Sequence, residues 1–507
     1  MTYLVRGEFV VTMQEPPGSN GIIRDGCVYV SGQEIVEIGR YDDLRSKYPN
    51  ATIMGTPQFW VMPGFVNAHQ HGKGVTNFQL GGIDEAFELS RIKGSPRAKV
   101  PPYLDTLYAA LRMIESGITT TFHYNASRSP ELYQADVRER LRAYNDAGLR
   151  VSFGLDIRNR NHLVYGDDEF LTTLPDELKE KARERATKSR TADPETYFRF
   201  AEQLHEELNA APRGRIKLCL APAGPQWCTE ELLRAIRKFA NDRGLGIQIH
   251  VLETKYQRAY FLETYGKTAI EWLDQLGFLS PSVTLAHGVW LSARDMALVA
   301  ERGCAVVHNP SSNLRLKSGI APVAQFRAAG IPLAMGLDSS ALNDDMDMLQ
   351  EMRLCANLQR VPGVGAVALP LADIFAATTA SGSKILGWGD RCGTLEPGKD
   401  ADLVLIDPAR LRGPYLSPEQ SPIDALIYRG RSTDVDTVMI GGEVVYADKQ
   451  HRRLDSRAVL EQVRESLETA DSNKLDPFDE QLLPHMIRYY QAWDDEALTP
   501  HYIVNSR

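Results

Sequence analysis

The chain has 507 residues, enough for a large α/β core with an accessory unit. Its 43% hydrophobic and 24% charged residues are ordinary for a soluble globular protein, and a net charge of −9 argues against a nucleic-acid partner. The six cysteines are scattered without a Cys-x-x-Cys pair, which argues against a disulfide framework and favours a reducing, cytoplasmic location. We expect neither a signal peptide nor a membrane span.

The first 60 residues predict short strands separated by turns. Residues 3–12, 27–30 and 34–39 are rich in β-branched residues and are bounded by glycine, proline and Asn-Gly turn signals. Similar patterns return at residues 393–406 and 435–446. Because the N-terminal segment is too short to form a sandwich alone, we expect residues 1–60 and 390–452 to form one small β-sandwich domain.

Between residues 61 and 389 the pattern changes to strands alternating with helices. The helical periodicity at residues 104–115 and 132–147 ends at a glycine signal in both cases. The apolar runs that predict strands include residues 59–66, 118–122, 150–155, 215–220, 246–250, 283–287, 305–308 and 331–337. We count about nine candidate strands, close to the eight of a parallel (β/α)8 TIM-type barrel, so the predicted class is α/β.

Two further segments are predicted to be helical. Residues 156–208 form a charge-rich insertion, which we interpret as a solvated helical excursion, with a substrate lid as the alternative. Residues 453–507 predict a helical C-terminal extension with an apolar side at residues 482–490. This extension either packs back on the protein or joins a second subunit, and we expect a homodimer or a higher homo-oligomer.

Two histidines, His69 and His71, follow the apolar run at residues 59–66. If this segment is a strand, side chains alternate between its faces, so both imidazoles lie on one side and Gln70 points away. Two imidazoles on one face can bind a divalent metal, although such a pair can also arise by chance on a surface loop.

More candidate groups lie at the carboxyl ends of predicted strands, where barrels carry their chemistry. His250 and His287 end their strands, Asp338 follows its own, and Glu253 lies three residues after His250. Each alone can be an ordinary buried polar residue, but the ordered set predicts a metal site. A divalent metal lowers the pKa of bound water to about 7. Glu253 and Asp338 can then divide the proton transfers, and His287 can hydrogen-bond the attacking oxygen.

Several motifs resemble the amidohydrolase superfamily over nearly the whole chain. The most specific begin at His308, in His-Asn-Pro-Ser-Ser-Asn-Leu-Arg-Leu-Lys-Ser-Gly-Ile-Ala-Pro, and at Leu395, in Leu-Glu-Pro-Gly-Lys-Asp-Ala-Asp-Leu-Val. Others are Pro-Gly-Phe-Val-Asn-Ala-His-Gln-His, ending at His71, and His-Val-Leu-Glu-Thr, starting at His250. The His-x-x-Glu element is similar to that of the aminohydrolase and triazine chlorohydrolase branch.

This resemblance implies one divalent metal ion per subunit, with zinc as the first choice and iron or manganese as alternatives. The implied ligands are His69, His71, His250 and Asp338. It also implies that Glu253 shuttles protons and that His287 contacts the attacking water. Binuclear relatives use a carboxylated lysine as a bridge, but Lys217 lies inside its predicted strand, so we interpret the site as mononuclear.

Departures from the branch's pattern bear on the substrate. Ala223 replaces a histidine that deaminases of this branch usually carry, and His123 adds an unusual histidine near the barrel mouth. The first change disfavours purine or nucleoside deamination and favours a less polar aryl or azine substrate. The predicted substrate-binding residues, each of which can instead serve ordinary packing or capping, are Gln79, His123, Gln226, Trp227 and His308.

The leading hypothesis is a hydrolase that displaces an amine from a cyclic amidine or nitrogen heteroaromatic ring, with a small molecule as its only partner besides other subunits. The runner-up uses the same groups on an arylurea, carbamate, amide or substituted triazine. A non-catalytic metal scaffold is the remote alternative, because such a protein has no need of the proton-transfer groups.

Overall fold

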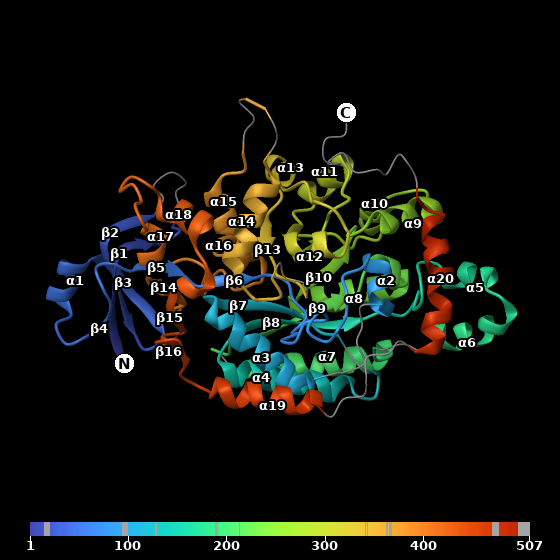
Figure 1. Cartoon of the computed structure of the whole chain (residues 1–507), viewed down its shortest axis with the longest axis horizontal. Coiled ribbons are helices and arrows are strands. Elements are labelled where there is room, and N and C mark those ends of the chain that lie inside the picture. Colours follow the sequence, from blue (N-terminus) through green and yellow to red (C-terminus); the bar gives the residue numbers. More distant parts are fainter. Residues whose placement is uncertain are drawn as a thin grey trace.

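The protein is described from a computed structural model. It has two β-sheets, one in a barrel and one beside it (Figure 1). The structure describes residues 1–14, 21–93, 100–126, 129–187, 191–211, 213–339, 341, 343–360, 363–364, 368–468 and 476–494.

The barrel sheet contains eight parallel strands in the order β13-β12-β11-β10-β9-β8-β7-β6. Their bounds are β6 (Phe65–Asn67), β7 (Ile118–Tyr124), β8 (Arg150–Ile157), β9 (Ile216–Pro222), β10 (Gly246–Val251), β11 (Val283–His287), β12 (Ala305–His308) and β13 (Leu333–Met335). Backbone bonds from Ala68 N to Met335 O (2.8 Å) and from Asp338 N to His69 O (2.9 Å) join the first and last strands. The predicted barrel is therefore confirmed.

Helices surround this sheet in the alternating pattern that parallel strands require (Figure 1). They are α3 (Pro102–Glu115), α4 (Tyr133–Ala147), α7 (Pro194–Asn209), η1 (Pro225–Trp227), α8 (Glu230–Arg243), α9 (Lys255–Tyr265), α10 (Ala269–Gln275), α11 (Ala293–Glu301), α12 (Pro310–Arg315), α13 (Val323–Ala328), α14 (Met348–Leu358), α15 (Leu371–Ala377) and α16 (Ala380–Ile385). Capping boxes at Thr268 and Ser292 fix the starts of α10 and α11.

The second sheet draws strands from both ends of the chain. Its strands are β1 (Thr2–Val11), β2 (Ile22–Ser31), β3 (Glu34–Arg40), β4 (Thr52–Gly55), β5 (Trp60–Pro63), β14 (Leu403–Ile406), β15 (Val435–Ile440), β16 (Glu443–Ala447) and β17 (Gln450–His451). Antiparallel pairing of β5 with β14 joins the two ends. The helices beside it are α1 (Tyr41–Lys47), α17 (Ala409–Arg412), α18 (Pro422–Arg429) and η2 (Ser432–Asp434). The small domain is thus one sheet of nine strands; its predicted boundaries stay a prediction.

The apolar run at residues 59–66 forms two strands, one in each sheet. Its first part is β5 of the mixed sheet and its second part is β6 of the barrel. Gly64 separates them, and a Cβ atom at this position would lie 2.1 Å from Thr119 Oγ1. The close approach of β7 therefore requires glycine where the chain passes from one sheet to the other.

The insertion and the C-terminal tail pack together at one end of the barrel, where α20 lies beside α2 and α5 (Figure 1). The helices at this end are α2 (Phe87–Lys93), α5 (Asp167–Thr173), α6 (Asp176–Thr187) and α20 (Pro477–Gln491), whereas α19 (Ser456–Glu468) packs on α3. Tyr489 on α20 donates a hydrogen bond to Tyr165 O (2.8 Å). The described tail packs back on the protein, while residues 469–475 and 495–507 lie outside the described residues.

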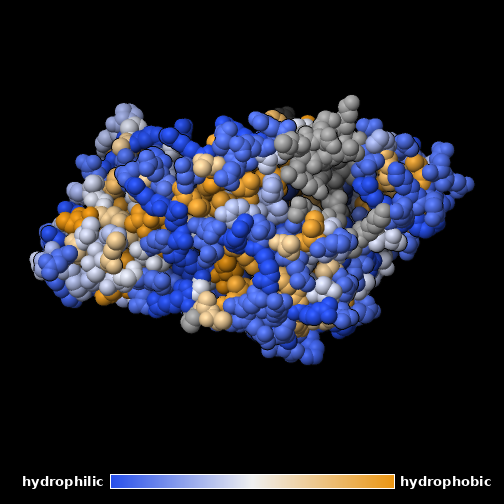
Figure 2. All heavy atoms as spheres, turned by 90° about the horizontal axis from the view of Figure 1, so that it is seen from below, coloured by the Kyte–Doolittle hydropathy of each residue, from blue (hydrophilic) through white to orange (hydrophobic). Residues whose placement is uncertain are grey.

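The face in Figure 2 carries hydrophilic side chains over most of its area, with hydrophobic ones in smaller groups between them. Among the described residues, no helix combines the length and the apolar character needed to cross a membrane. The oligomeric state stays a prediction.

A buried ion pair links the two sheets. Arg150, at the start of β8, is fully buried and hydrogen-bonds Asp400 Oδ2 and both carboxylate oxygens of Asp402, each at 2.9 Å. Both aspartates precede β14. Removing one partner from a buried pair leaves the other charges uncompensated.

We predict that Arg150→Met lowers the free energy of unfolding by about 3–5 kcal/mol. Arg138→Met, which breaks an exposed pair with Glu207, should cost about 1 kcal/mol or less. Chemical denaturation of both variants measures the difference, and equal losses would contradict the assigned role of Arg150.

Candidate active site

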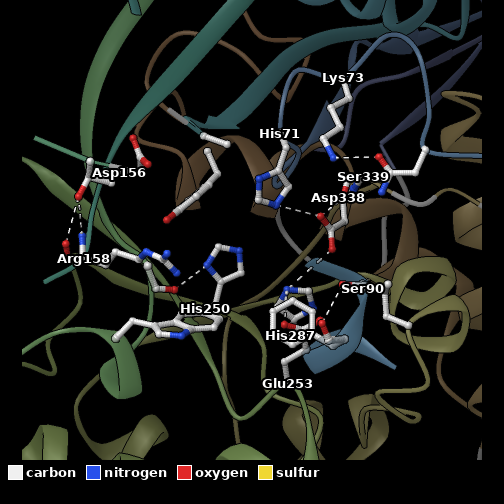
Figure 3. A pocket seen from close by; sticks show the side chains of 18 residues that line it. His71, Lys73, Ser90, Asp156, Arg158, His250, Glu253, His287, Asp338 and Ser339 are labelled. Carbon is white, nitrogen blue, oxygen red and sulfur yellow. Dashed lines mark hydrogen bonds and ion pairs between the residues drawn. The ribbon is translucent and has the colours of Figure 1, made fainter. Parts of the chain in front are cut away.

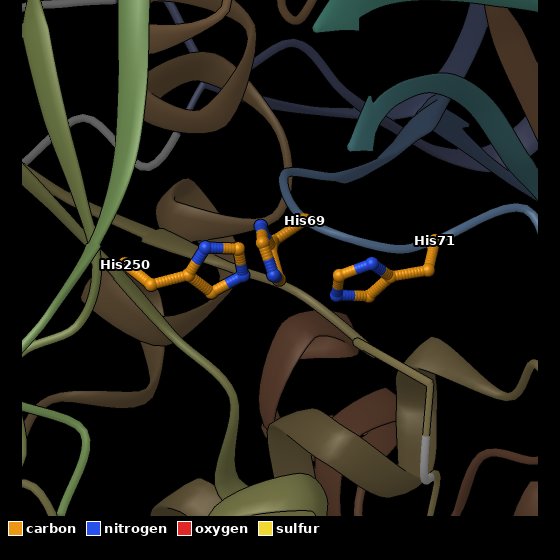
Figure 4. Close-up of side chains that lie close together, drawn as sticks. All are labelled: His69, His71 and His250. Carbon is orange, nitrogen blue, oxygen red and sulfur yellow. The ribbon is translucent and has the colours of Figure 1, made fainter. Parts of the chain in front are cut away.

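His69 and His71 lie in the loop that follows β6, not on a strand as predicted, because β6 ends at Asn67. Asn67 Oδ1 accepts from Leu337 N (3.0 Å), which ties this loop to the end of β13. Both imidazoles still reach the same centre, with ring centroids 5.2 Å apart, and His250 approaches from the opposite side to His71 (Figure 4). As predicted, Gln70 turns away.

Two of the three imidazoles are oriented through their Nδ1 atoms. Gln248 donates through its amide nitrogen to Ala68 O (3.0 Å), so its oxygen accepts from Nδ1 of His69 (2.6 Å). His250 Nδ1 donates to Ala223 O (2.9 Å). The Nε2 lone pairs therefore face the common centre, and His69 Nε2 is buried without a hydrogen-bond partner among the described residues.

Asp338 brings a carboxylate to the same centre. Its Oδ1 lies 3.1 Å from His71 Nε2 and 3.8 Å from His69 Nε2. Ser312 Oγ donates to Oδ2 (2.6 Å) and Ser339 N to Oδ1 (2.7 Å). Candidate ligand atoms lie within 4.8 Å of one another in two groups, one of His69, His71 and His250, and one of His69, His287 and Asp338.

The protonation states suit a metal. Burial lowers the pKa of His69 to about 3 and holds the pKa of His250 well below its usual value. Burial opposes ionisation of Asp338, but its hydrogen bond with His71 and the nearby histidines hold its pKa well below the usual range. Neutral imidazoles and an ionised carboxylate are the forms that bind metal, so these residues fit a divalent ion.

Glu253 and His287 lie beside the candidate ligands (Figure 3). His287 Nδ1 contacts Asn313 Oδ1 (2.8 Å), and its Nε2 is 3.8 Å from Glu253 Oε2 and 3.9 Å from Asp338 Oδ2. Burial, followed by the charges of Asp338 and Glu88, raises the pKa of Glu253 well above its usual value. Glu253 can therefore carry a proton into the site.

A cavity of about 280 Å³ opens over these groups. Figure 3 places Asp156 and Arg158 on one side of His250, and Lys73 and Ser339 beyond His71 on the other. The aromatic side chains that line the cavity are Phe87, Tyr124 and Trp227. Aromatic walls together with these charged and polar groups suit a flat ring with polar substituents.

The predicted substrate-binding residues divide between the cavity wall and other places. Trp227 lines the cavity, and the other four are not among its lining residues. Gln79 is exposed, with Oε1 accepting from Thr76 N (2.9 Å). His123 is buried behind the His69–His71 loop, and Gln226 and His308 are fully buried.

Sequence reasoning missed several lining residues that it had signals for. Asp156 and Arg158 come at the carboxyl end of β8, where the strand-end rule applies, and Lys73 comes two residues after His71. Phe87 and Ser90 belong to α2, whose position over the cavity no sequence pattern indicated.

The sequence pattern of the amidohydrolase family matches residues 60–445 of this chain. The chain belongs to the amidohydrolase family. It is a metal-dependent hydrolase that acts on carbon–nitrogen bonds other than peptide bonds, which confirms the predicted enzyme class.

Relatives cover nearly the full length of this amidohydrolase. It is 30% identical over 471 residues to a 5'-deoxyadenosine deaminase of Methanosarcina mazei, covering 92% of this chain and 97% of the relative. It is 32% identical over 464 residues to a 5-methylthioadenosine/S-adenosylhomocysteine deaminase of Pelotomaculum thermopropionicum, covering 90% and 96%. An adenosine deaminase from Xanthomonas campestris, solved with bound zinc, is 26% identical with a TM-score of 0.77, covering 92% and 98%.

The burial of His308 predicts a pH dependence. Burial lowers its pKa from 6.5 to about 3, so the unfolded chain binds this proton between these two pH values and the folded protein does not. His308 therefore does not lower the free energy of unfolding above pH 6.5, and it lowers that free energy progressively as the pH falls from 6.5 toward 3.

We expect His308 to cost the metal-free protein about 2 kcal/mol of stability at pH 5 relative to pH 7.5. His308→Phe should reduce the loss between these pH values by that amount in denaturant titrations. Above pH 6.5 the two curves should run parallel. An unchanged loss in the variant would contradict the neutral state of His308.

Proposed function

We propose that this protein is an aminohydrolase that releases ammonia from the adenine-type base of a purine nucleoside. The observation that carries the proposal is the convergence of buried imidazole nitrogens and the Asp338 carboxylate next to Glu253, a carboxyl group able to hold a proton. The names of the relatives support the choice of substrate.

In this proposal His69, His71, His250 and Asp338 hold one divalent metal ion. Zinc is the first choice, because three imidazoles and a carboxylate suit it and a similar adenosine deaminase carries it, while iron and manganese are alternatives. The ion would lower the pKa of a water molecule so that, at neutral pH, the water can lose a proton and act as a nucleophile toward a ring carbon.

The chain's own groups then move the protons. Glu253, with its raised pKa, donates a proton to the ring nitrogen as the water adds to the ring carbon. Asp338 takes one proton of the water and passes it to the departing amine, while the proton left on the new hydroxyl returns to Glu253 as the ring carbonyl forms. His287 is 3.8 Å from Glu253 and 3.9 Å from Asp338, so it can hydrogen-bond the attacking oxygen between them.

The cavity wall bears on the substrate. Trp227 and Phe87 offer flat surfaces for a base, with ring centroids 5.9 Å apart. Ala223 lines the cavity without a polar side chain, which favoured an aryl or azine substrate and leaves that as the second candidate. We favour the purine nucleoside because Lys73, Asp156 and Arg158 offer the polar contacts that position 223 lacks.

The test is a turnover screen that measures released ammonia. Adenosine, 5'-deoxyadenosine, 5'-methylthioadenosine and S-adenosylhomocysteine are compared with aminotriazines, aminopyrimidines and arylureas. Turnover of the nucleosides supports the proposal. Turnover of only the azines or ureas refutes it in favour of the second candidate.

Glu253→Gln should lower kcat on the best substrate by about 10²- to 10⁴-fold, since the amide has no proton to transfer as an acid. The variant should keep its bound metal, measured by elemental analysis. The exposed Glu231→Gln on α8 serves as a matched control and should keep full activity. Undiminished turnover in Glu253→Gln would disprove the proton-shuttle role.

A further inference from the structure

A buried chain of three side chains lies directly behind the loop that carries His69 and His71. Gln70 Nε2 contacts the Tyr144 hydroxyl at 2.7 Å, and that hydroxyl contacts His123 Nδ1 at 2.8 Å. His123, Gln70 and Tyr144 are each fully buried. We call these three residues the Gln70 network.

The direction of each hydrogen bond follows from the chemistry of the groups. The amide nitrogen of Gln70 can only donate, so the tyrosine oxygen accepts from it. This leaves the single hydroxyl proton of Tyr144 available to Nδ1 of His123, which is the direction that a neutral ring protonated at Nε2 requires. Burial holds the pKa of His123 well below its usual value, which is consistent with a neutral ring that accepts at Nδ1.

The network also holds the backbone on the far side of His71. The oxygen of the Gln70 amide accepts a hydrogen bond from Gly72 N. His123 packs flat on Phe153, with centroids 4.6 Å apart and the planes 10° from parallel. Its other side lies so close to Gly72 that a Cβ atom there would be 2.1 Å from His123 Cε1. The loop therefore cannot shift toward β7.

His71 has more need of such support than the other imidazoles. Nδ1 of His69 is held by Gln248 and Nδ1 of His250 by Ala223 O. Within the part of the chain that the structure describes, no residue hydrogen-bonds Nδ1 of His71, and its side chain is 18% exposed. Apart from the contact of its Nε2 with Asp338 (3.1 Å), the direction of its ring therefore depends on where Gln70 and Gly72 hold the backbone.

We propose that Gln70, Tyr144 and His123 are positioning residues that set the direction of His71 and so the metal affinity of the site. The inference rests on the ligand set of the proposed function. It assigns His123 a role outside the substrate cavity, behind the ligand loop. Partners that orient metal ligands commonly change metal affinity about 10- to 100-fold when removed.

The experiment measures Zn²⁺ affinity by competition with a chromophoric chelator, together with the visible spectrum of the Co²⁺-substituted protein. Tyr144→Phe and His123→Leu should each weaken Zn²⁺ binding about 10- to 100-fold and alter the Co²⁺ spectrum. His123→Asn can place its amide oxygen where Nδ1 lay, so it should restore affinity to within about threefold of wild type.

Tyr133→Phe is the matched control. Tyr133 is also fully buried on α4, and Tyr133→Phe removes the hydrogen bond of a buried hydroxyl, to Asp156 O (3.0 Å), that is not part of the Gln70 network. It should keep wild-type affinity and spectrum. The proposal is overturned if Tyr144→Phe and His123→Leu bind Zn²⁺ as wild type does, if Tyr133→Phe loses as much, or if His123→Asn fails to rescue.

The measurement on wild-type protein distinguishes the proposed metal ligands from the proposed positioning role. Wild-type protein that binds neither Zn²⁺ nor Co²⁺ would refute the ligand set and this proposal with it. Tight wild-type binding with unaffected variants would refute only the positioning role, leaving the proposed function intact.

Discussion

The candidate site depends on the burial of a cluster of imidazole and carboxylate groups at one end of the barrel. His69, His250, His287 and Asp338 are all at most 7% exposed. Burial keeps the pKa values of these histidines low, while His71 and the nearby histidines favour the charged form of Asp338, whose oxygens also accept hydrogen bonds from Ser312 and Ser339. Such a dry, pre-arranged set of donors is costly to leave empty, which is why it fits a bound cation.

The contact between the first and last strands of the barrel holds these groups together. The first and last strands meet where Asp338 N donates to His69 O, so the bond that closes the barrel also joins two candidate ligands. Residues about 270 positions apart in sequence are thereby held side by side by the backbone itself. The barrel's fold and its metal geometry are two consequences of one set of strand contacts.

The cavity above this centre is completed by segments outside the barrel. Glu88 on α2 accepts hydrogen bonds from Tyr165 OH (3.1 Å) in the insertion and from Thr254, next to Glu253. Tyr165 is held in turn by Tyr489 and Tyr490 of α20. Three segments far apart in sequence thus meet beside Glu253, and burial raises the pKa of Glu88 to about 7.

The sequence by itself predicted the barrel, a small β-domain built from both chain ends, and the candidate residues His69, His71, His250, Glu253, His287 and Asp338. These follow from local rules, because apolar runs predict strands and the carboxyl ends of parallel strands meet on one face. Only the tertiary structure decided that His123 lies behind the loop. It also decided that α2 lines the cavity and that α20 packs on α2. Those outcomes depend on packing between distant segments, which leaves no periodic pattern in the sequence of either partner.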